Sequence, residues 1–176
     1  MIDLHIGRQT FDYDCGAKAL QTVMAYYGVE VREDELMKAL GTGQDGTPVS
    51  AMVMVAQQNG FEVKACQGWT LKELKRLVID LEHPVIVLLQ AWAERYMTVE
   101  EWRTEYDHGH YAIVIGFAKG LLLFEDPGSF RRTWLREREF LARWHDRDPD
   151  THKQYEHFGM VLLGKAPVGK SIEHMN

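Results

Sequence analysis

The apolar residues of this chain change their spacing near residue 82. Before that point, four segments have patterns typical of helices: 15–28, 32–41, 47–60 and 70–82. After it, short β-branched and apolar runs are bounded by glycine, proline or aspartate: 84–90, 110–118, 121–128 and 158–165. A weaker strand pattern occupies residues 61–66. Helices first and antiparallel strands later predict an α+β fold, in which an N-terminal helical layer packs on a C-terminal antiparallel sheet.

The residues at the ends of the predicted helices support this division. Gly28 is placed to cap the C-terminus of the first helix. Thr47 is placed as the N-cap of the third helix, with Pro48 at its first helical position. Thr70 is followed three residues later by Glu73, which predicts a capping box at the fourth helix.

The second half of the chain contains a predicted hairpin and an insertion. The run "HYAIVIGFAKGLLLFEDPG" reads as two strands that turn at residues 118–120. A tryptophan-rich insertion, residues 91–109, precedes this hairpin and is expected to be partly helical, while residues 135–146 predict one more helix. The length of 176 residues suits one domain, 1–176, with a flexible tail at 167–176.

Composition excludes several classes of protein. The formal net charge of −6 argues against a nucleic-acid partner, so the locally basic stretches "KELKR" and "SFRRTWLRER" are expected to be solvated faces. The N-terminus does not resemble a secretory signal, and no apolar run approaches the ~20 residues that a membrane helix needs. The two cysteines, Cys15 and Cys66, are too few for a disulfide scaffold. A cytoplasmic location fits these features best.

Cys15 lies where the first predicted helix begins, in the stretch "QTFDYDCG". The N-terminus of a helix favours a thiolate through its unpaired N–H groups and its dipole, and the thiolate is the nucleophilic form of cysteine. Gly16 leaves space for a substrate carbonyl or a second backbone segment to approach. A cysteine in an apolar helix is also a common small core residue, so this feature alone leaves both interpretations open.

A thiol nucleophile needs a base, and His110 is the strongest candidate. It begins the predicted strand "HYAIVIG", from which its ring could point across a cleft. His108 is the nearest competitor, because residues two apart on a strand share a face. A histidine on a strand can also be purely structural.

Asp126 and Gln9 could complete such a site. Asp126 follows the second strand of the hairpin, where its carboxylate could orient an imidazole, although Asp-Pro-Gly is also an ordinary turn sequence. Glu125 should point to the opposite face. The Gln9 amide could donate a hydrogen bond to a developing oxyanion, together with the backbone N–H of Cys15.

Taken together, these motifs resemble the bacteriocin-processing cysteine peptidases, which are papain-like domains that remove double-glycine leader peptides. The resemblance rests on "QTFDYDCGAKAL" with "YYG", then "HYAIVIG", then "FEDPG", and it covers residues 5–130. It implies a papain-like fold in which Cys15 is the nucleophile, His110 the base, Asp126 the orienting acid and Gln9 the oxyanion donor. Relatives in this family often form the front end of an exporter, whereas this chain is expected to be a stand-alone domain.

The insertion at 91–109 departs from the pattern expected of exporter domains. It lies just before the proposed base, so it could shape the substrate cleft or form a lid, or its aromatic residues Trp92, Tyr96 and Trp102 could simply pack it onto the body. We assign Gly16, Trp92, Trp102 and His108 to substrate binding.

Other functions remain open at this stage. The same four catalytic residues could serve acyl transfer on another amide, and the fold could be a peptide-binding module without activity. A metal site built from His108 and His110 with Cys15 or Asp126 is a further alternative, although we expect no metal and no cofactor. The expected partner is a peptide or protein substrate, and the sequence carries no signal for an oligomeric state. Cys66 is expected to be buried, and the run "HDRDPDTHKQYEH" to be a solvated loop.

Overall fold

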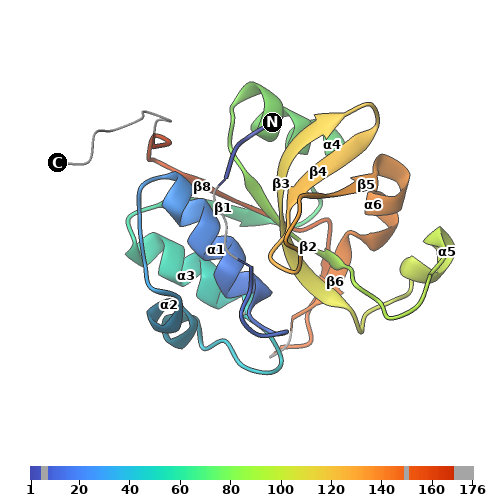
Figure 1. Cartoon of the computed structure of the whole chain (residues 1–176), viewed down its shortest axis with the longest axis horizontal. Helices are drawn as coiled ribbons and strands as arrows, with labels where there is room; N and C mark the ends of the chain where they lie inside the picture. The colour runs from blue at the N-terminus through green and yellow to red at the C-terminus, as the bar shows by residue number, and fades with distance from the viewer. Residues whose placement is uncertain (5–7, 149–150, 169–176) are drawn as a thin grey trace.

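A computed structural model describes residues 1–4, 8–148 and 151–168. Three helices gather on one side of the molecule, in blue to teal, and a twisted sheet lies beside them (Figure 1). These helices are α1 (Cys15–Tyr26), α2 (Glu33–Leu40) and α3 (Val49–Gln58). The arrangement confirms the predicted α+β fold with an N-terminal helical layer on an antiparallel sheet.

The main sheet has six strands in the order β1-β8-β2-β3-β4-β5, and each neighbouring pair is antiparallel. The strands are β1 (Glu62–Cys66), β2 (Val85–Gln90), β3 (Gly109–Ala118), β4 (Leu121–Glu125), β5 (Thr133–Arg136) and β8 (Gly159–Leu163). Every residue of β2 is buried, which explains its continuous apolar sequence. The centre of the sheet is therefore fully buried, and His110 lies near one end of the neighbouring strand β3.

The hairpin between β3 and β4 has the predicted turn. Ala118 pairs with Leu121, and the two residues between them have positive φ angles, 51° for Lys119 and 78° for Gly120. Such a turn matches the right-handed twist of two adjoining strands. This hairpin brings the sequence after β4 back beside the start of β3.

Helix α1 occupies the interface between the helical layer and the sheet. Its apolar residues Leu20, Val23 and Met24 are fully buried. Gly16 is also buried, and a Cβ at this position would lie 2.7 Å from the Cβ of Thr47. The glycine therefore permits a close approach between α1 and the segment that precedes α3.

Two predicted helix caps are wrong in detail. Helix α3 begins at Val49 with Pro48 as its N-cap, so Thr47 is not the cap. Instead the Thr47 hydroxyl lies 2.9 Å from that of Thr42, and the Thr47 carbonyl accepts a hydrogen bond from the Tyr111 hydroxyl (3.0 Å). These tertiary contacts compete successfully with local capping.

Helix α1 ends one residue earlier than predicted. Tyr27 is the C-cap, and Gly28 follows it with a φ of 76°. The fourth helix has the predicted capping box between Thr70 and Glu73, but α4 (Leu71–Lys75) continues as a π-helical turn, η1 (Arg76–Asp80). No described helix is long and apolar enough to cross a membrane.

The C-terminal third differs most from the prediction. Residues 91–109 contain the short helix α5 (Val99–Trp102). The predicted helix at 135–146 is α6 (Glu137–Arg143), but the strand before it, β5, was not predicted. The expected solvated loop at 145–157 is wrong: β6 (His145–Arg147) and β7 (Gln154–Glu156) form a second sheet. The cause is Trp144, which is fully buried and donates its indole N–H to the Phe158 carbonyl (2.8 Å).

The prediction for Cys66 is also wrong. The residue ends β1 and is exposed, and its sulfur accepts the indole N–H of Trp69. The organisation of 1–176 as a single domain stays a prediction. Most of the predicted tail at 167–176 lies outside the described residues, since only 167 and 168 are described.

Candidate active site

Cys15 is the first residue of α1, and 7% of its surface is exposed. The preceding residue, Asp14, does not cap the helix. Its Oδ2 turns back and accepts hydrogen bonds from the backbone N–H groups of Thr10 (3.1 Å) and Phe11 (3.2 Å). Asp14 thus shapes the loop before the helix and leaves the N–H groups at the helix start unoccupied by its carboxylate.

His110 and Asp126 form a buried pair. The Nε2 of His110 lies 2.7 Å from Oδ1 of Asp126. The register of the hairpin explains the pairing, because Ile113 of β3 lies opposite Glu125, the last residue of β4. The next residue therefore comes close to the start of β3. Glu125 itself is engaged elsewhere, accepting a hydrogen bond from Nε of Arg132 (3.0 Å).

The Asp126 carboxylate is held by further donors. Its Oδ1 accepts the backbone N–H of Gly128 (2.8 Å), and its Oδ2 accepts the hydroxyl of Thr133 (3.2 Å). Burial alone would raise the pKa of Asp126, but the hydrogen bond and charge of His110 outweigh it and lower that pKa. The acid is therefore ionised and fixed in orientation.

Cys15 is the second group that acts on the His110 ring. Burial opposes the charged imidazole, yet hydrogen bonding to Asp126 and to Cys15, with the charges of both, raises the pKa of His110 to about 10. Because Nε2 faces Asp126, Nδ1 is the nitrogen available to the sulfur. The structure thus brings together three side chains that are remote in the sequence.

Gln9 lies at the edge of this group. Its backbone N–H donates to the Pro127 carbonyl (3.0 Å), which ties the loop before α1 to the turn after Asp126. Its side-chain Nε2 donates to the Phe11 carbonyl (2.7 Å), and its Oε1 is buried without a hydrogen-bond partner among the described residues. The role of Gln9 as oxyanion donor stays a prediction.

Two cavities flank the pair. A cleft of about 290 Å³ opens beside the sulfur and is bordered by Cys15, Thr47, Leu88 and Tyr111; we call it the Cys15 cleft. A pocket of about 200 Å³ lies beside the ring, which we call the His110 pocket. Cys15 and His110 therefore each border a hollow of their own.

The wall of the Cys15 cleft includes Asp146, a residue of the unpredicted strand β6. Its Oδ1 accepts a hydrogen bond from Nε2 of Gln90 (2.8 Å). Burial raises the pKa of Asp146 to about 6, although neighbouring donors oppose this shift. A Cβ on Gly109 would collide with this carboxylate, so a larger residue before His110 would displace the Asp146 side chain.

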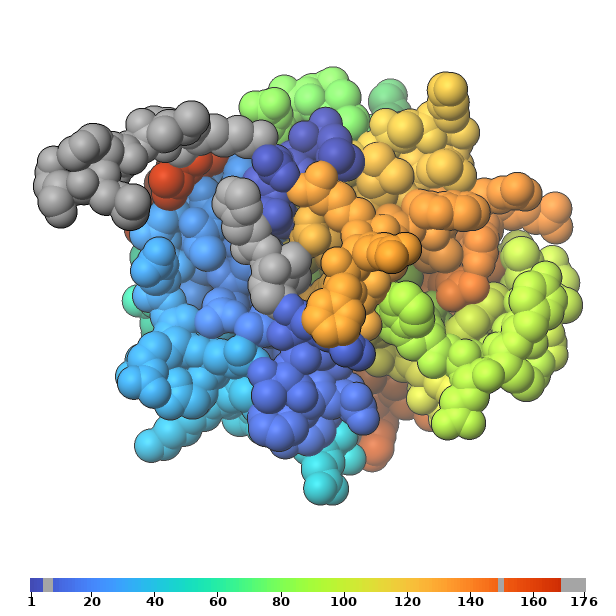
Figure 2. All heavy atoms as spheres, viewed as in Figure 1, coloured from blue at the N-terminus to red at the C-terminus, as the bar shows by residue number. Residues whose placement is uncertain are grey.

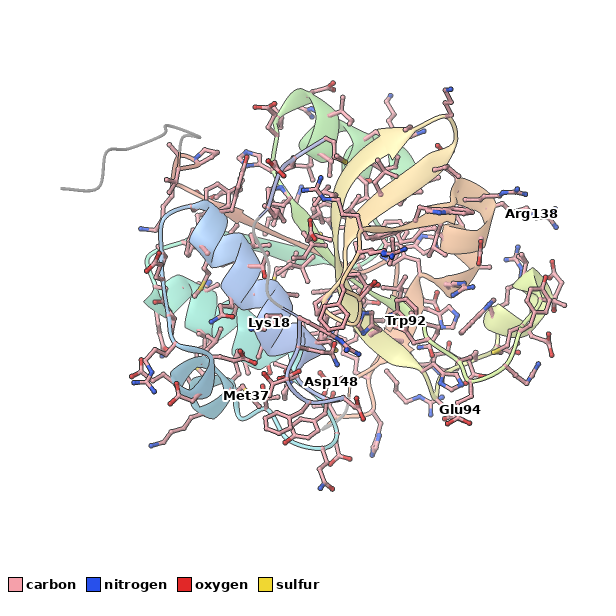
Figure 3. The ribbon with its side chains drawn as sticks, in the orientation of Figure 1. Lys18, Met37, Trp92, Glu94, Arg138 and Asp148 are labelled. Carbon is pink, nitrogen blue, oxygen red and sulfur yellow. The ribbon has the colours of Figure 1, made fainter. Side chains whose placement is uncertain are left out.

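Trp92, a predicted substrate-binding residue, borders the His110 pocket. It is 55% exposed and has a φ of 61°, which is unusual for a large side chain. A Cβ on Gly128 would lie 3.0 Å from the Trp92 indole nitrogen and 3.4 Å from Cε1 of His110. Trp92 thus stands next to the His110–Asp126 pair, near the middle of the face shown in Figure 3.

The other residues assigned to substrate binding have mixed positions. Gly16 is buried against Thr47. Trp102 is 3% exposed and stacks under the guanidinium of Arg143, 3.9 Å from the ring centre. His108 turns its ring toward Trp102, with ring centres 6.2 Å apart. Contact of these residues with a substrate stays a prediction.

The histidines of the "HGH" motif point to different partners. His108 lies beside Trp102, whereas His110 binds Asp126. Within the described part of the chain, no three histidine, cysteine or acidic side chains are grouped so that they could hold a metal ion.

Comparison with known families identifies the family of this chain. The model of the peptidase C39 family matches residues 3–147. The chain belongs to the peptidase C39 family. Among curated relatives, an uncharacterised protein of Methanothermobacter marburgensis is 32% identical over 89 residues, which is 47% of this chain and 62% of the relative. The transport/processing ATP-binding protein ComA of Streptococcus pneumoniae is 28% identical over 142 residues, which is 80% of this chain and 17% of ComA.

Solved structures show the same fold over about nine-tenths of the chain. A double-glycine motif protease from an AMS/PCAT transporter, in complex with a leader peptide, matches with a TM-score of 0.64 and 17% identity, covering 91% of both chains. The peptidase domain of Streptococcus ComA matches with a TM-score of 0.62 and 20% identity, covering 91% of this chain and 98% of that domain. A C39-like peptidase of Bacillus anthracis matches with a TM-score of 0.68 and 15% identity, covering 93% of this chain and 96% of that one.

Sequence reasoning missed several residues around the site of this C39 peptidase. Gly128 and Thr133 hold the acid, and the only local signal was the turn sequence after Asp126. Asp146 and Arg143 reach the cavities from β6 and α6. Their positions depend on how the C-terminal third folds back over the sheet, which no local pattern indicates.

Proposed function

We propose that this C39 domain is a cysteine peptidase that uses Cys15, His110 and Asp126 as its catalytic triad. One observation carries the proposal: the His110 ring has Asp126 on Nε2 at 2.7 Å, and Cys15 is close enough to the same ring to raise its pKa. A proton shared by sulfur and imidazole gives a thiolate–imidazolium pair, which is the reactive form in thiol catalysis. The buried, ionised carboxylate stabilises that charged ring.

In the first half of the reaction, the Cys15 sulfur attacks a peptide carbonyl carbon, and the C–O double bond opens to an oxyanion. Collapse of this intermediate breaks the C–N bond, while Nδ1–H of His110 protonates the leaving amine. The amine product departs and a thioester remains. In the second half, neutral His110 takes a proton from water, the hydroxide adds to the thioester, and release of the carboxylic acid restores the thiolate and the imidazolium.

The oxyanion would be stabilised by N–H groups beside the sulfur. The backbone N–H of Cys15 is at the start of α1, where the helix dipole favours negative charge. The Gln9 amide has two N–H bonds and gives one to the Phe11 carbonyl, which leaves one for the oxyanion. We therefore assign Gln9 as the second donor.

We further propose that the substrate is a leader or propeptide that is cut at a small-residue site in the cytoplasm. The family and the leader-peptide complex of one structural neighbour support this substrate class. The two cavities on either side of the Cys15–His110 pair also suit an extended peptide better than a compact ligand.

The test is a panel of synthetic peptides that carry Gly-Gly, Ala-Ala or Leu-Leu in a common flanking sequence, with products identified by mass spectrometry. The wild-type chain should cut within the panel, and Cys15→Ala should not. Cys66→Ala is the matched control, because it removes the exposed thiol and leaves the site intact. Cleavage that survives Cys15→Ala would overturn the proposal, and binding without any cleavage would favour a peptide-binding module.

A further inference from the structure

The insertion at 91–109 and helix α6 form a third hollow, of about 680 Å³. Trp92, Trp134 and Arg143 border both this hollow and the His110 pocket. The hollow therefore adjoins the His110 pocket, with these three side chains at the boundary between them. In Figure 2 the yellow-green insertion and the orange β5–α6 region lie next to each other on the right of this face. We call this hollow the arginine groove.

The charge of the arginine groove is opposite to that of the molecule. The chain has a formal net charge of −6, yet the groove is bordered by four arginines and a single carboxylate: Arg95, Arg136, Arg138, Arg143 and Glu139. A positive groove on a negative protein indicates selection for an acidic ligand rather than a general surface property.

Not all of these arginines are neutralised within the protein. Arg95 pairs with Glu101 at 2.9 Å, and Arg143 pairs with Glu139. Arg138 lies 3.7 Å from a carboxylate oxygen of Glu100 in a largely exposed contact, which contributes little. For Arg136 the described residues offer no ion-pair partner, and its side chain is exposed. Two cations on β5 and α6 are thus available to a ligand; Arg138 lies toward the edge of the face in Figure 3.

The same groove contains buried donors that lack acceptors. The Trp102 indole N–H has no hydrogen-bond partner among the described residues, and Trp102 is 3% exposed. The Nε of Arg143 is likewise buried without a partner in that part of the chain. Unpaired buried donors cost free energy, so a ligand oxygen that reached either N–H group would be stabilised there.

The groove also exposes aromatic surface. Tyr96 is 86% exposed, and Trp92 and Trp134 are 55% and 54% exposed. Large exposed aromatic side chains beside arginines are typical of peptide-binding surfaces. The occupant that fits all these features is a peptide segment that combines apolar or aromatic residues with aspartate or glutamate.

We infer that the arginine groove is a specificity subsite that holds an acidic segment of the substrate, beyond the scissile bond on the His110 side. This inference rests on the proposed peptidase function for its place in the reaction, but the binding it predicts can be measured without turnover. Arg136 and Arg138 would contact the acidic side chains, while Trp92 and Trp134 would cover the apolar ones.

The binding test captures a random pool of dodecapeptides on immobilised Cys15→Ala chain and identifies the retained peptides by mass spectrometry. Retained peptides should be enriched in aspartate and glutamate about tenfold, as expected for two exposed ion pairs. The double variant Arg136→Glu/Arg138→Glu should lose this enrichment. Its matched control, Lys38→Glu/Lys119→Glu, makes the same change in net charge on α2 and on the β3–β4 turn, and it should keep the enrichment.

Turnover separates this inference from the proposed function. With active chain, a substrate that carries glutamates at the enriched positions should show a kcat/KM about tenfold higher than its lysine counterpart, and the Arg136→Glu/Arg138→Glu variant should reverse that preference. A chain that retains acidic peptides but cuts none refutes the peptidase and not the groove. Retention without acidic enrichment, enrichment that survives the charge reversal, or stronger retention of a thymidine dodecamer than of any peptide overturns the groove.

Discussion

The two sides of the Cys15–His110 pair differ in charge and in origin. The Cys15 cleft is bordered by four carboxylates, Asp12, Asp45, Asp107 and Asp146, with a single arginine, Arg147. The arginine groove, on the His110 side, has the opposite balance. The shared pair is formed by elements of the common fold, whereas the surfaces around it come largely from loops, the insertion and the C-terminal third. If the proposals above hold, the pair supplies the chemistry, while the surfaces on either side of it supply the recognition.

The positions of Cys15 and of His110 are also set by different kinds of interaction, one local and one between strands. Cys15 is positioned by local sequence, because it begins α1 after the loop that Asp14 closes. His110 and Asp126 are positioned by the pairing of β3 with β4. A substitution in the Cys15 cleft should therefore leave the arginine groove folded, and the reverse should also hold, so variants can test each region separately.

The largest effect on activity should follow from removing the Cys15 sulfur. Cys15→Ala should lower kcat/KM by at least about 10⁴-fold, since no other group can form the thioester. Peptide hydrolysis measured against Cys66→Ala, which should retain full activity, checks this. Equal losses in the two variants would contradict the assignment of the nucleophile.

The next largest effect on activity should come from changing Asp126, the acid that binds His110. Asp126→Asn should lower kcat by about 10²- to 10⁴-fold, because the imidazolium loses its ionic partner. The pKa of His110, about 10 with both partners present, should fall in this variant, so the alkaline limit of the pH profile should move to lower pH. Glu125→Gln is the control, because that side chain binds Arg132 on the other face. An unchanged alkaline limit in Asp126→Asn would contradict the account.

A smaller effect should come from crowding the boundary between the pair and the arginine groove. In Gly128→Ala the new methyl group would lie 3.0 Å from the Trp92 indole nitrogen and 3.3 Å from Oδ1 of Asp126. Displacement of either group should lower kcat about tenfold with little change in thermal stability. Gly43→Ala is the matched control, because its methyl group would meet no atom within 4 Å. Wild-type kinetics for Gly128→Ala would show that Trp92 does not support the site.

The smallest effect concerns the acidic side and appears as a pH dependence of stability. Because burial raises the pKa of Asp146 to about 6, the folded state retains a proton that the unfolded state releases near pH 4. The contribution of Asp146 to the free energy of unfolding should therefore fall as the pH rises from 4 to 6, by up to about 3 kcal/mol. Asp146→Asn should lack this fall while its amide oxygen still accepts from Gln90.

Thermal melts of wild type and Asp146→Asn at pH 4 and pH 7 check this prediction. The variant should gain stability over wild type only at the higher pH. Asp45→Asn, at an exposed position in the same cleft, should follow wild type at both values. Parallel curves for wild type and Asp146→Asn would show that Asp146 is not held in a destabilising environment.

The sequence was sufficient to predict those elements that depend on local geometry. The helix start at Cys15 and the capping box at Thr70 follow from short spacings. The hairpin also followed from sequence, because Lys119-Gly120 specifies a two-residue turn and hence the approach of Asp126 to His110. The convergence of Cys15 with His110 needed the family resemblance, since no local pattern links α1 to β3.

The sequence was insufficient to predict those features that contacts between distant residues determine. The run around Asp146 is rich in charges and reads as solvated, yet Trp144 anchors it and buries it against β2. Cys66 is the last residue of β1, where exposed and partly buried residues alternate, and it lies on the exposed face. Thr47 has the side chain of a good N-cap, but its contacts with Thr42 and Tyr111 take precedence. In each case a tertiary contact overrides a correct local preference.

The central claim is that Cys15 and His110 share a proton, and thiol alkylation tests it most directly. Iodoacetamide labelling of each cysteine is followed by mass spectrometry from pH 5 to pH 9, in wild type and in His110→Ala. The account predicts that Cys15 reacts before Cys66 at pH 6 in wild type, although Cys66 is the exposed residue, and that His110→Ala removes this advantage. Faster labelling of Cys66 at every pH, or a Cys15 rate that is the same with and without His110, would contradict it.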